Sequence, residues 1–390
     1  MKKDWEIKKL DDVCELITCG VAARPKYVDN GIPFLSAKNV KEGKVIYEGY
    51  NCVSEKTHKE LTKHNKPLLG DILYTRVGSY GEAAVIEHDI DFSVFVSLTL
   101  IKTNKSVLNN YFLRYYLNSN EVKTLAKSSI ASSGVGNLNV GTVRKFPIPI
   151  PPLYEQLHIV SFLDDTFVAL DQVKENLQHN LQNVTDIYQS ELNNIFTKKE
   201  DSWINKQLNQ ISENLDSKRI PITKNVRTSG EYPYYGASGV VDYVGEYIFD
   251  DNLLLVSEDG ANLLARTYPI AFSISGKTWV NNHAHVLKFE NLSNQKFVEY
   301  YLNSIKLDDF VSGMAQPKLN QAMLNAIPIP FPPFETQKDI LMRLDSLSLQ
   351  TKKLEDNYQK KLDNLEELKK SILQKVFNGE LTMKQTKTFA

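Results

Sequence analysis

Apolar positions recur at helical spacing over the last part of the chain. Between residues 340 and 376, each step from one apolar or small residue to the next is three or four positions, without Gly or Pro. This spacing places the residues on one helix face, as a heptad-like seam. The seam consists of Ile340, Leu344, Leu347, Thr351, Leu354, Tyr358, Leu362, Leu365, Leu368, Ile372 and Val376. A helix on the order of 60 Å long is expected there.

A second seam occurs earlier, and the two are copies of one another. It consists of Ile159, Leu163, Leu170, Val173, Leu177, Leu181, Val184, Ile187 and Ile195. Residues 146–156 read Phe-Pro-Ile-Pro-Ile-Pro-Pro-Leu-Tyr-Glu-Gln, and 327–337, which lie 181 positions later, read Ile-Pro-Ile-Pro-Phe-Pro-Pro-Phe-Glu-Thr-Gln. Proline holds both stretches extended before each helix begins. The chain is therefore predicted to be two copies of one domain-plus-helix unit, related by an approximate internal dyad.

The segments outside the helices indicate mixed domains. Short apolar runs bounded by turn residues predict strands at Ile32–Leu35, Asp71–Thr75, Ala83–Ile86 and Phe92–Ile101, and a helix is expected over Asn110–Leu117. Residues 203–326 repeat this plan loosely, because Trp5 matches Trp203 and the Tyr-Tyr-Leu-Asn-Ser of 115–119 returns at 300–304. The central portions do not align.

The expected fold is α+β. Two mixed α/β domains in a pseudo-twofold arrangement would be separated by two long antiparallel coiled-coil helices. The expected ranges are a first domain at 1–150, a first helix at 151–200, a second domain at 201–331 and a second helix at 332–390.

The helices need partners, because one amphipathic helix cannot bury its seam alone. Residues 153–202 carry 3 Lys+Arg against 9 Asp+Glu, whereas residues 334–390 carry 11 against 9. This charge difference favours pairing between the two helices, with one helix face left for partners. The alternative is that each helix packs on its own domain.

Composition narrows the class of protein. Only three cysteines occur (Cys14, Cys19 and Cys52), none as CxxC, which favours a reducing compartment over a disulfide scaffold. The charged N-terminus lacks a following apolar stretch, and the longest apolar run, near 94–101, is too short for a membrane span. A soluble cytoplasmic protein without membrane contact is expected.

The net charge argues against a protein that binds DNA tightly by itself. The formal charge is −1, and residues 1–152 carry only 21 Lys+Arg against 16 Asp+Glu. A strongly basic domain is the usual mark of a nucleic-acid binder. These numbers leave open a reader of DNA that obtains phosphate contacts from a partner.

Motifs for catalysis are incomplete or missing. The end of a phosphate-binding loop is suggested by Ser275–Thr278, but Ala271 stands where its first glycine belongs. There is no GxGxxG after a strand, and no Asn-Pro-Pro-aromatic tetrapeptide of the kind that an amino-methyltransferase needs. His283 and His285 have no nearby cysteine or carboxylate cluster in the sequence, which favours hydrogen-bonding or base-contacting roles over a metal site. No catalytic residue, metal or cofactor is expected in this chain.

Several loops are better suited to binding than to packing. They concentrate amide, imidazole, hydroxyl and guanidinium groups, which can read donor and acceptor patterns in the major groove. They lie at residues 36–39, 74–80 and 132–139 in the first domain and at 232–239, 257–262 and 279–285 in the second, and Leu138-Asn139 returns as Leu319-Asn320. A plain surface turn explains any single loop equally well, but their number and their placement in both halves favour binding.

The chain resembles the specificity subunit of a Type I restriction–modification system. The carrying features are the doubled Pro-Ile-Pro-x-Pro-Pro stretch before a long helix and the helix-ending run at 371–381. The second domain adds Tyr232–Gly239, Glu258–Asn262 and Val280–Val286, which are similar to one class of target-recognition domain. One departure is that Thr336 stands where the first copy has Glu155, directly before the glutamine.

The resemblance implies a non-catalytic reader of double-stranded DNA. Each target-recognition domain would read half of a split, asymmetric site, and the helices would set the spacing. They would also dock two methyltransferase subunits, which bring S-adenosylmethionine, and restriction subunits that use ATP would join, as in phage defence. The side chains expected at the DNA are Lys38, Asn39, Arg76, Ser79, Tyr80, Asn137, Asn139, Tyr235, Ser238, Asn262, Asn281, Asn282, His283, Lys318 and Asn320.

Two other classes of function fit the residues by themselves. One is a coiled-coil scaffold whose globular domains bind protein without sequence-specific DNA binding. The other is an enzyme with an unrecognised site. Loss of sequence-specific binding after exchange of residues 203–326 would favour the reader over the scaffold, whereas DNA cleavage or methylation by this chain alone would favour the enzyme.

Overall fold

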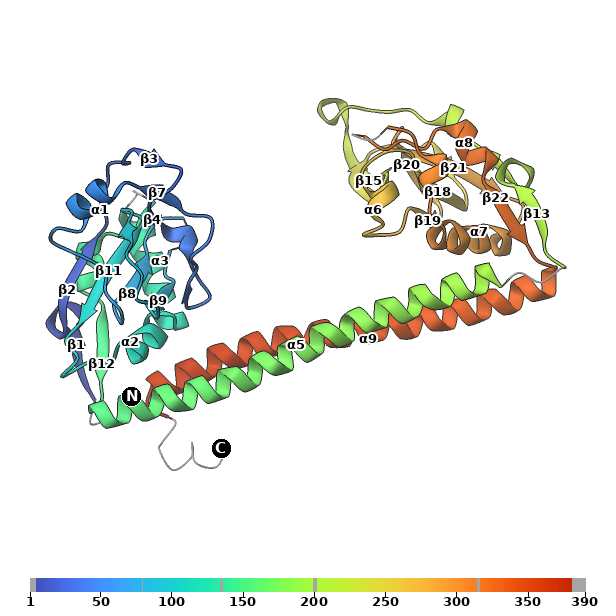
Figure 1. Cartoon of the computed structure of the whole chain (residues 1–390). Coiled ribbons are helices and arrows are strands. Elements are labelled where there is room, and N and C mark those ends of the chain that lie inside the picture. Colours follow the sequence, from blue (N-terminus) through green and yellow to red (C-terminus); the bar gives the residue numbers. More distant parts are fainter. Residues whose placement is uncertain (1–4, 79, 134–135, 199–201, 314–315, 381–390) are drawn as a thin grey trace. The chain divides into compact units, whose positions relative to one another are not determined.

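The computed structural model describes residues 5–78, 80–133, 136–198, 202–313 and 316–380 (Figure 1). The chain divides into two compact units. Unit 1 comprises residues 1–177 and 360–390, and unit 2 comprises residues 178–359. No helix of the described residues is long and apolar enough to cross a membrane.

Unit 1 is built on an antiparallel sheet of four strands in the order β2-β11-β8-β9. These strands are β2 (Cys14–Cys19), β11 (Leu98–Thr103), β8 (Ile72–Thr75) and β9 (Ala83–Val85). A second sheet has the order β10-β4-β7-β3, with β10 (Ser93–Val94), β4 (Ile32–Leu35), β7 (Asn51–Val53) and β3 (Tyr27–Val28). Two further pairs are β1 (Glu6–Lys9) with β12 (Pro147–Ile150) and β5 (Val40–Lys41) with β6 (Lys44–Val45).

The helices of unit 1 lie mainly after the sheet strands in sequence. They are α1 (Glu55–Leu61), α2 (Asn110–Leu117), α3 (Asn120–Ser133), α4 (Val140–Arg144) and the first part of α5 (Leu153–Thr197). Short 3₁₀ turns occur at Leu10–Val13 and Ala37–Asn39. The strand predicted over 92–101 is wrong in one respect, because it is two strands, β10 and β11, separated by a turn in which Leu98 N–H donates to Phe95 O at 2.9 Å.

Unit 2 repeats the plan of unit 1. Its antiparallel sheet has the order β14-β21-β18-β19, with β14 (Ser212–Asn214), β21 (Ala284–Phe289), β18 (Leu253–Ser257) and β19 (Ala271–Ile274). The second sheet has the order β16-β15-β20-β17, with β16 (Gly239–Val244), β15 (Ser229–Gly236), β20 (Lys277–Val280) and β17 (Phe249–Asp250). The proline strand β22 (Pro328–Phe331) pairs with β13 (Ile204–Gln207), as β12 pairs with β1.

Unit 2 contains short helices and the start of the second long helix. They are α6 (Asn262–Ala265), α7 (Leu292–Ser304), α8 (Gln321–Ala326) and the first part of α9 (Phe334–Phe377), with 3₁₀ turns at Leu208–Gln210, Asp216–Lys218, Lys224–Val226 and Asp308–Phe310. The α+β fold class with two mixed domains and two long helices, predicted from the sequence, is confirmed.

The central strands of each unit are buried on both faces. In β8, Ile72 and Tyr74 join the core that faces the helices, whereas Leu73 joins the core that faces the second sheet. In β18, Leu254 joins the core that faces the helices, whereas Leu255 joins the core that faces the second sheet. Successive side chains of a strand point to opposite faces, so a strand covered on both sides reads as a continuous apolar run.

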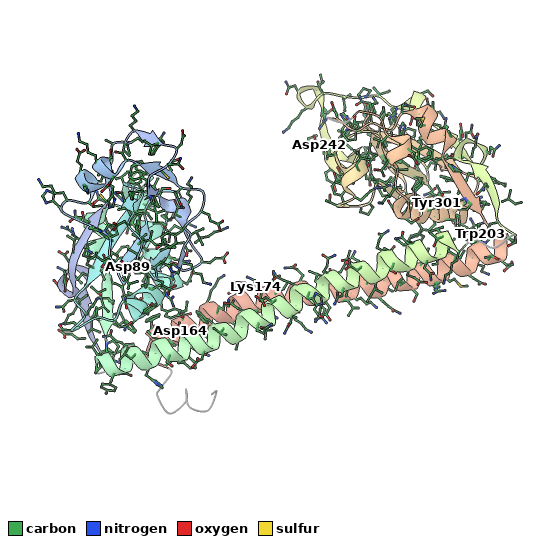
Figure 2. The ribbon with its side chains drawn as sticks, viewed as in Figure 1. Asp89, Asp164, Lys174, Trp203, Asp242 and Tyr301 are labelled. Atoms are coloured by element: carbon green, nitrogen blue, oxygen red, sulfur yellow. The ribbon has the colours of Figure 1, made fainter. Side chains whose placement is uncertain are left out.

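The two long helices run antiparallel within each unit. In unit 1, Lys174 of α5, which is labelled in Figure 2, bonds Glu366 of α9 at 2.9 Å. Asp171 of α5 pairs with Lys369 of α9. The α9 residue number falls as the α5 number rises, which is the antiparallel sense. In unit 2, Glu191 of α5 pairs with Arg343 of α9 in the same sense.

The end of α9 completes the core of unit 1. Phe377 packs edge-on against Phe112 of α2, with ring centroids 5.4 Å apart, and against Tyr116 at 5.1 Å. Leu373 and Val376 belong to the same core. The N-terminal domain is thus closed by residues from the other end of the chain.

The end of α5 performs the same packing in unit 2. Phe196 lies 181 positions before Phe377, and its ring centroid is 5.4 Å from that of Phe297 and 5.3 Å from that of Tyr301. Each long helix therefore packs on one globular domain at its start and on the other at its end. The alternative in which each helix packs only on its own domain is wrong.

Candidate nucleic-acid interface

Backbone hydrogen bonds gather the polar loops of unit 2. Glu258 N–H donates to His283 O at 2.9 Å, and Leu319 N–H donates to Glu258 O at 2.8 Å. Asn281 N–H donates to Tyr235 O at 3.0 Å, which adds the turn between β15 and β16. We call the assembled residues 235–238, 257–262, 281–283 and 318–320 the unit 2 edge.

Unit 1 assembles its own loops with the same backbone pattern. Arg76 N–H donates to Ser97 O at 3.0 Å, and Leu138 N–H donates to Arg76 O at 2.9 Å. Ala37 N–H donates to Ser97 Oγ at 2.9 Å. We call residues 36–39, 76–78, 80, 97 and 137–139 the unit 1 edge.

Ten of the residues expected at DNA are accessible to some degree on these edges. Those that are exposed are Lys38, Asn139, Ser238, Asn282, His283, Lys318 and Asn320, and those that are half-buried are Tyr80, Asn137 and Tyr235. Ser79 lies outside the described residues. The structure therefore brings most of the expected side chains of each half together, including pairs that are far apart in sequence.

Two residues expected at DNA in unit 1 are buried in supporting roles. Asn39 is 1% exposed; its Oδ1 accepts from Ser36 N–H at 3.1 Å, and its Nδ2 donates to Ile46 O and Glu48 O. Arg76 is also buried, and its Nε donates to Leu138 O at 2.8 Å. Both side chains form their hydrogen bonds with the backbone of neighbouring loops and so hold those loops in place.

Unit 2 contains two comparable buried amides. Asn262 Nδ2 donates to Tyr268 O at 2.8 Å, and its Oδ1 accepts from Thr267 N–H at 2.9 Å. Asn281 Oδ1 accepts from His283 N–H at 2.8 Å. Asn281 thus fixes the loop that carries His283, and Asn262 fixes the turn at residues 267–268, so both side chains support the edge in this structure.

Asn139 and Asn320 each cap a short helix at the edge. Asn139 Oδ1 accepts from Gly141 N–H at 2.8 Å, and Asn320 Oδ1 accepts from Met323 N–H at 2.9 Å. Capping satisfies backbone donors at the helix start and fixes the side chain's direction. Both amides remain exposed, each directly after a buried leucine.

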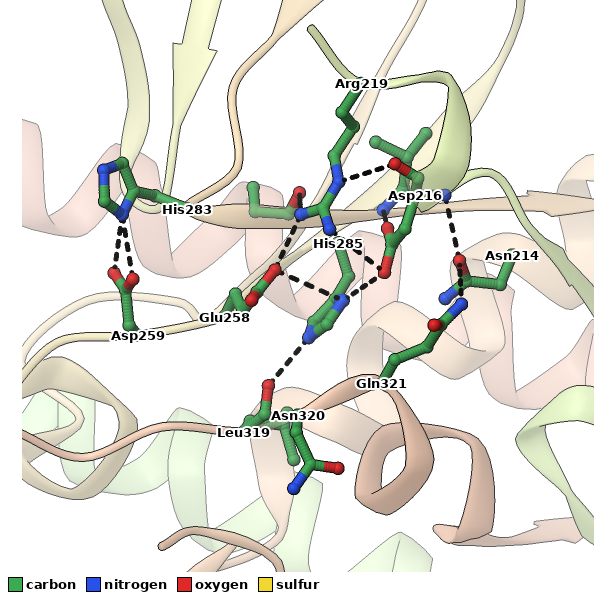
Figure 3. Close-up of polar contacts among 12 residues, drawn as sticks. Asn214, Asp216, Arg219, Glu258, Asp259, His283, His285, Leu319, Asn320 and Gln321 are labelled. Carbon is green, nitrogen blue, oxygen red and sulfur yellow. Dashed lines mark hydrogen bonds and ion pairs between the residues drawn. The ribbon is translucent and has the colours of Figure 1, made fainter. Parts of the chain in front are cut away.

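A cluster of charged side chains adjoins the unit 2 edge and includes Glu258 and Lys318 of that edge; Figure 3 shows Asp216, Arg219, Glu258 and His285 of the cluster. His285 Nδ1 lies 2.5 Å from Asp216 Oδ2 and 3.8 Å from Glu258 Oε2. Arg219 bonds Glu258 at 2.7 Å and lies 3.5 Å from Asp216. Lys318, which is exposed, pairs with Glu258, and its Nζ lies 3.2 Å from Glu258 Oε1. Five side chains from four separate segments thus form one ion-pair cluster.

Neighbouring cations keep both carboxylates of the cluster ionised. Burial alone would raise the pKa of Asp216, but the hydrogen bond and charge of His285, Val286 N–H and Arg219 hold that pKa below its ordinary value. Burial would likewise raise the pKa of Glu258, and the bond from Arg219, with the charge of His285, lowers it. Ion pairing therefore outweighs desolvation at both carboxyl groups.

The same three acidic and imidazole groups have the spacing of a metal site. The ligand atoms of Asp216, Glu258 and His285 lie within 4.8 Å of one another. Arg219 and Lys318 already neutralise the carboxylates, however, and His285 Nε2 is 2.8 Å from Leu319 O. A chelated cation would have to displace these partners, so we assign an ion-pair cluster here.

Sequence reasoning missed part of this arrangement. The statement that no carboxylates lie near His285 is wrong, because Asp216 and Glu258 come from positions 69 and 27 residues earlier. Arg219 was not singled out either. No local motif marks these residues, since only the pairing of β14 and β18 with β21 brings them together.

Comparisons with known proteins find a family whose model matches most of the chain. A family model described as the Type I restriction modification DNA specificity domain matches residues 2–183 and again 200–364. A Haemophilus influenzae protein named as a type I restriction enzyme specificity subunit is 33% identical over 185 residues, 43% of this chain and 48% of that protein. The chain thus aligns with about half the length of that relative.

Two further matches extend over nearly the whole chain. The specificity subunit of the type I restriction enzyme MjaVIII, from Methanocaldococcus jannaschii, is 24% identical, and the match covers 98% of this chain and 94% of that protein. A solved structure described as the basis of complex assembly and conformational transition of the type I R-M system has a TM-score of 0.78 at 17% identity. The match covers 98% of this chain and 99% of the chain in that structure, so the two chains share a fold.

Proposed function

The chain belongs to the family of Type I restriction–modification specificity subunits, and on that premise we propose that it reads a bipartite, asymmetric site in double-stranded DNA. The observation that carries the proposal is the pair of edges. Both are assembled by the same backbone hydrogen bonds, yet their exposed side chains differ. Two domains with the same backbone arrangement but different exposed side chains are what recognition of two different half-sites would need.

The exposed side chains of each edge would contact the DNA. Asn282 and Asn320 in unit 2 and Asn139 in unit 1 offer amides for base edges, and such contacts contribute about 1–3 kcal/mol of discrimination each. Lys38 and Lys318 suit phosphate contacts, which position the protein without reading sequence. The remaining accessible residues, Tyr80, Asn137, Tyr235, Ser238 and His283, would complete the two surfaces. Asn39, Arg76, Asn262 and Asn281 would act indirectly, by holding the loops.

The long helices would dock two methyltransferase subunits. Three exposed apolar positions on the helices recur after 181 residues: Val168 and Leu349, Val173 and Leu354, and Ile187 and Leu368. The last four were expected in the buried seams, and that expectation is wrong for them. Unit 1 holds Val168, Val173 and Leu368, whereas unit 2 holds the three counterparts. Each unit therefore offers one copy of the same apolar set, which fits two copies of one partner.

The chemistry would reside on those partners. We propose that the chain is not itself an enzyme and binds no cofactor. The methyltransferase subunits would bring S-adenosylmethionine, and restriction subunits that use ATP would join the assembly. A complex of this kind would act on DNA in the cytoplasm, as a defence against phage.

Exchange of one reading domain provides the main test. Residues 203–326 would be replaced with the corresponding segment of another family member, and the DNA methylated by the complex with its methyltransferase would be mapped by methylome sequencing. We expect one half of the motif to change and the other half to stay. A matched exchange of residues 1–145 should change only the other half.

Three outcomes would contradict the proposal. If both halves changed together, the domains would not read independently. If neither changed, the domains would not read sequence, which is the outcome expected for a coiled-coil scaffold. If this chain methylated or cut DNA without its partners, it would be an enzyme.

A further inference from the structure

Each unit has a mostly exposed segment that carries cations and no acid. It follows β2 in unit 1 and β14 in unit 2, and it leads from the first sheet to the second, at β3 and at β15. We call residues 20–28 the unit 1 strap and residues 217–228 the unit 2 strap. Their cations are Arg24 and Lys26 in unit 1, and Lys218, Arg219, Lys224 and Arg227 in unit 2.

The unit 2 strap stands out against its own domain. Residues 203–333 carry 11 Lys+Arg against 13 Asp+Glu, and four of those cations lie in the strap, whereas all of those acids lie outside it. The strap is therefore a local cationic segment on a domain that is acidic as a whole.

Backbone hydrogen bonds hold the start of the unit 1 strap against the unit 1 edge. Val96 N–H donates to Val21 O at 2.9 Å. Gly20 N–H donates to Leu98 O at 3.2 Å. These bonds flank Ser97, which belongs to the unit 1 edge, so the strap leaves the sheet directly beside that edge.

Side chains fasten the unit 2 strap to the unit 2 edge. Arg219 donates to Glu258 at 2.7 Å, as Figure 3 shows, and to Ala284 O at 2.8 Å. Trp279 Nε1 donates to Ile220 O at 2.6 Å. Glu258 belongs to the unit 2 edge and Ala284 directly follows it, so this strap also starts beside its edge.

The cations of the straps divide into anchors and free side chains. Arg219 is paired with Glu258, and Arg227 is paired with Asp242 at 2.9 Å. The other four are exposed and form no ion pair within the part of the chain that the structure describes. They are Arg24 and Lys26 in unit 1 and Lys218 and Lys224 in unit 2. Each strap thus presents two free cations beside its edge.

Free cations in this position suit the phosphates of a duplex. Lys and Arg contacts to phosphate oxygens position a protein on DNA without reading sequence, and they release counterions, which adds to the affinity. The edges themselves offer little of this chemistry. Their exposed lysines are Lys38 and Lys318, and Lys318 already pairs with Glu258.

We propose that the two straps contact the phosphate backbone of duplex DNA, each beside the half-site that its own edge reads. The inference rests on the proposed function, because the ligand is the duplex that the edges would read. The straps contribute affinity and register but no sequence information. The recognised motif therefore depends on the edges, whereas the strength of binding depends on the edges and the straps together.

The salt dependence of DNA binding tests the straps. The full chain with its methyltransferase would be titrated with a duplex carrying the methylated motif and with a duplex of random sequence, between about 50 and 200 mM KCl. Each phosphate contact contributes about 0.9 to the slope of log K against log salt concentration. We expect Lys218→Gln and Lys224→Gln each to reduce that slope by about 0.9 on both duplexes, and Arg24→Gln combined with Lys26→Gln to reduce it by about 1.8. The methylated motif should stay unchanged in all of them.

Two further variants serve as controls. Lys218→Arg keeps the charge and should keep the wild-type slope. Lys198→Gln removes an exposed lysine that follows the end of α5, outside both straps and both edges, and it should also keep that slope. Wild-type slopes in all the strap variants would overturn the inference. An equal reduction by Lys198→Gln would overturn it too, because the effect would then be one of total charge.

Ethylation of single phosphates locates the contacts. With Lys218→Gln and Lys224→Gln combined, ethylation beside the half-site read by unit 2 should no longer interfere with binding, whereas ethylation beside the other half-site should still interfere. Interference that was lost at both half-sites, or at neither, would overturn the assignment of each strap to its own edge.

The same measurements separate this inference from the proposed function. Reduced slopes in a complex that methylates no defined motif would contradict the proposed function alone. A retained motif with wild-type slopes would contradict the inference alone. Wild-type slopes together with loss of the methyltransferase from the complex would also overturn the inference, in favour of straps that bind a protein partner.

Discussion

The cores of unit 1 and unit 2 are alike where apolar side chains meet. Phe377 and Phe196 sit on equivalent aromatic pairs with centroid distances that agree within a few tenths of an ångström. One of these phenylalanines precedes its domain in sequence, and the other follows its domain by more than two hundred residues. The comparison shows that the packing depends on the shape of the site and not on chain order.

One buried polar contact differs between the two units. Trp5 Nε1 donates to Glu155 at 3.2 Å in unit 1. In unit 2 the residue corresponding to Glu155 is Thr336, and the buried Nε1 of Trp203 has no hydrogen-bond partner among the described residues. The departure noticed in the sequence therefore has a physical consequence. This directional contact is lost in unit 2, whereas the apolar contacts of the two cores are shared.

The largest expected effect comes from lengthening the helices that both units share. Insertion of seven residues, about two turns, after Gln178 and after Gln359 keeps the seam in phase and both helix ends on their cores. Because each insertion adds about 10.5 Å, we expect the unspecified spacer of the DNA site to grow by about three base pairs at roughly 3.4 Å each. Methylome sequencing would measure the new spacing, with both half-sites unchanged.

The matched control lengthens only α5. An insertion after Gln178 alone shifts α5 against α9, so pairs such as Lys174 with Glu366 and the anchoring of Phe196 cannot all be kept. We expect this variant to be unstable. An active paired-insertion variant that still methylated the original spacing would show that the helices do not set the distance.

Substitution of each anchoring phenylalanine by alanine should destabilise one unit and leave the stability of the other unchanged. Phe377→Ala removes a buried ring from the core of unit 1, and Phe196→Ala does the same in unit 2. Each should lower the free energy of unfolding of its own unit by about 3–5 kcal/mol. Hydrogen exchange of β11 and of β18 would measure the two effects. If Phe377→Ala weakened β18 and spared β11, the proposed role of the C-terminal helix end would be wrong.

Acid should weaken unit 2 through its ion-pair cluster. The pKa values of Asp216 and Glu258 are lowered from ordinary values of 3.8 and 4.5. Groups whose pKa is lowered on folding contribute stability above their ordinary pKa, and that stability is lost as the pH falls through the folded value. We therefore expect unit 2 to lose stability below about pH 4.

The variant Asp216→Asn isolates this contribution. It should destabilise unit 2 by about 3 kcal/mol at neutral pH, because it removes a buried carboxylate that pairs with Arg219 and bonds His285. It should also flatten the acid dependence. Tryptophan fluorescence reports on unit 2 alone in a Trp5→Phe background, since Trp203 and Trp279 then remain. An unaltered acid profile in the Asp216→Asn variant would assign the acid sensitivity to other groups.

The smallest effect is expected from restoring the missing acid in unit 2. Thr336→Glu should give Trp203 Nε1 the acceptor that Trp5 has, and stabilise unit 2 by about 1 kcal/mol. The reverse change, Glu155→Thr, should destabilise unit 1 by a similar amount. Thermal unfolding of both variants would measure the difference. A destabilising Thr336→Glu substitution would mean that the carboxylate cannot reach the indole.

The sequence by itself determined the repeat, the two long helices and the loops that form the edges. These follow from local rules, since proline stretches, three-and-four spacing and runs of turn residues each act over a few positions. The helix at Asn110–Leu117 was located to the residue for that reason. Individual functional side chains were less accessible, because Asn39 and Asn262 look the same in sequence as Asn282 and Asn320.

Only the tertiary structure decided which of these polar groups are available. The Asn39 side chain is buried and forms its hydrogen bonds with the backbone of Ser36, Ile46 and Glu48, whereas Asn320 caps a helix and stays exposed. The structure also decided that Phe377 closes the first domain and that His285 meets Asp216. Such contacts join positions that are tens to hundreds of residues apart, and their formation depends on strand pairing and core packing. No local periodicity encodes them, because it describes only which face of its own element a residue occupies.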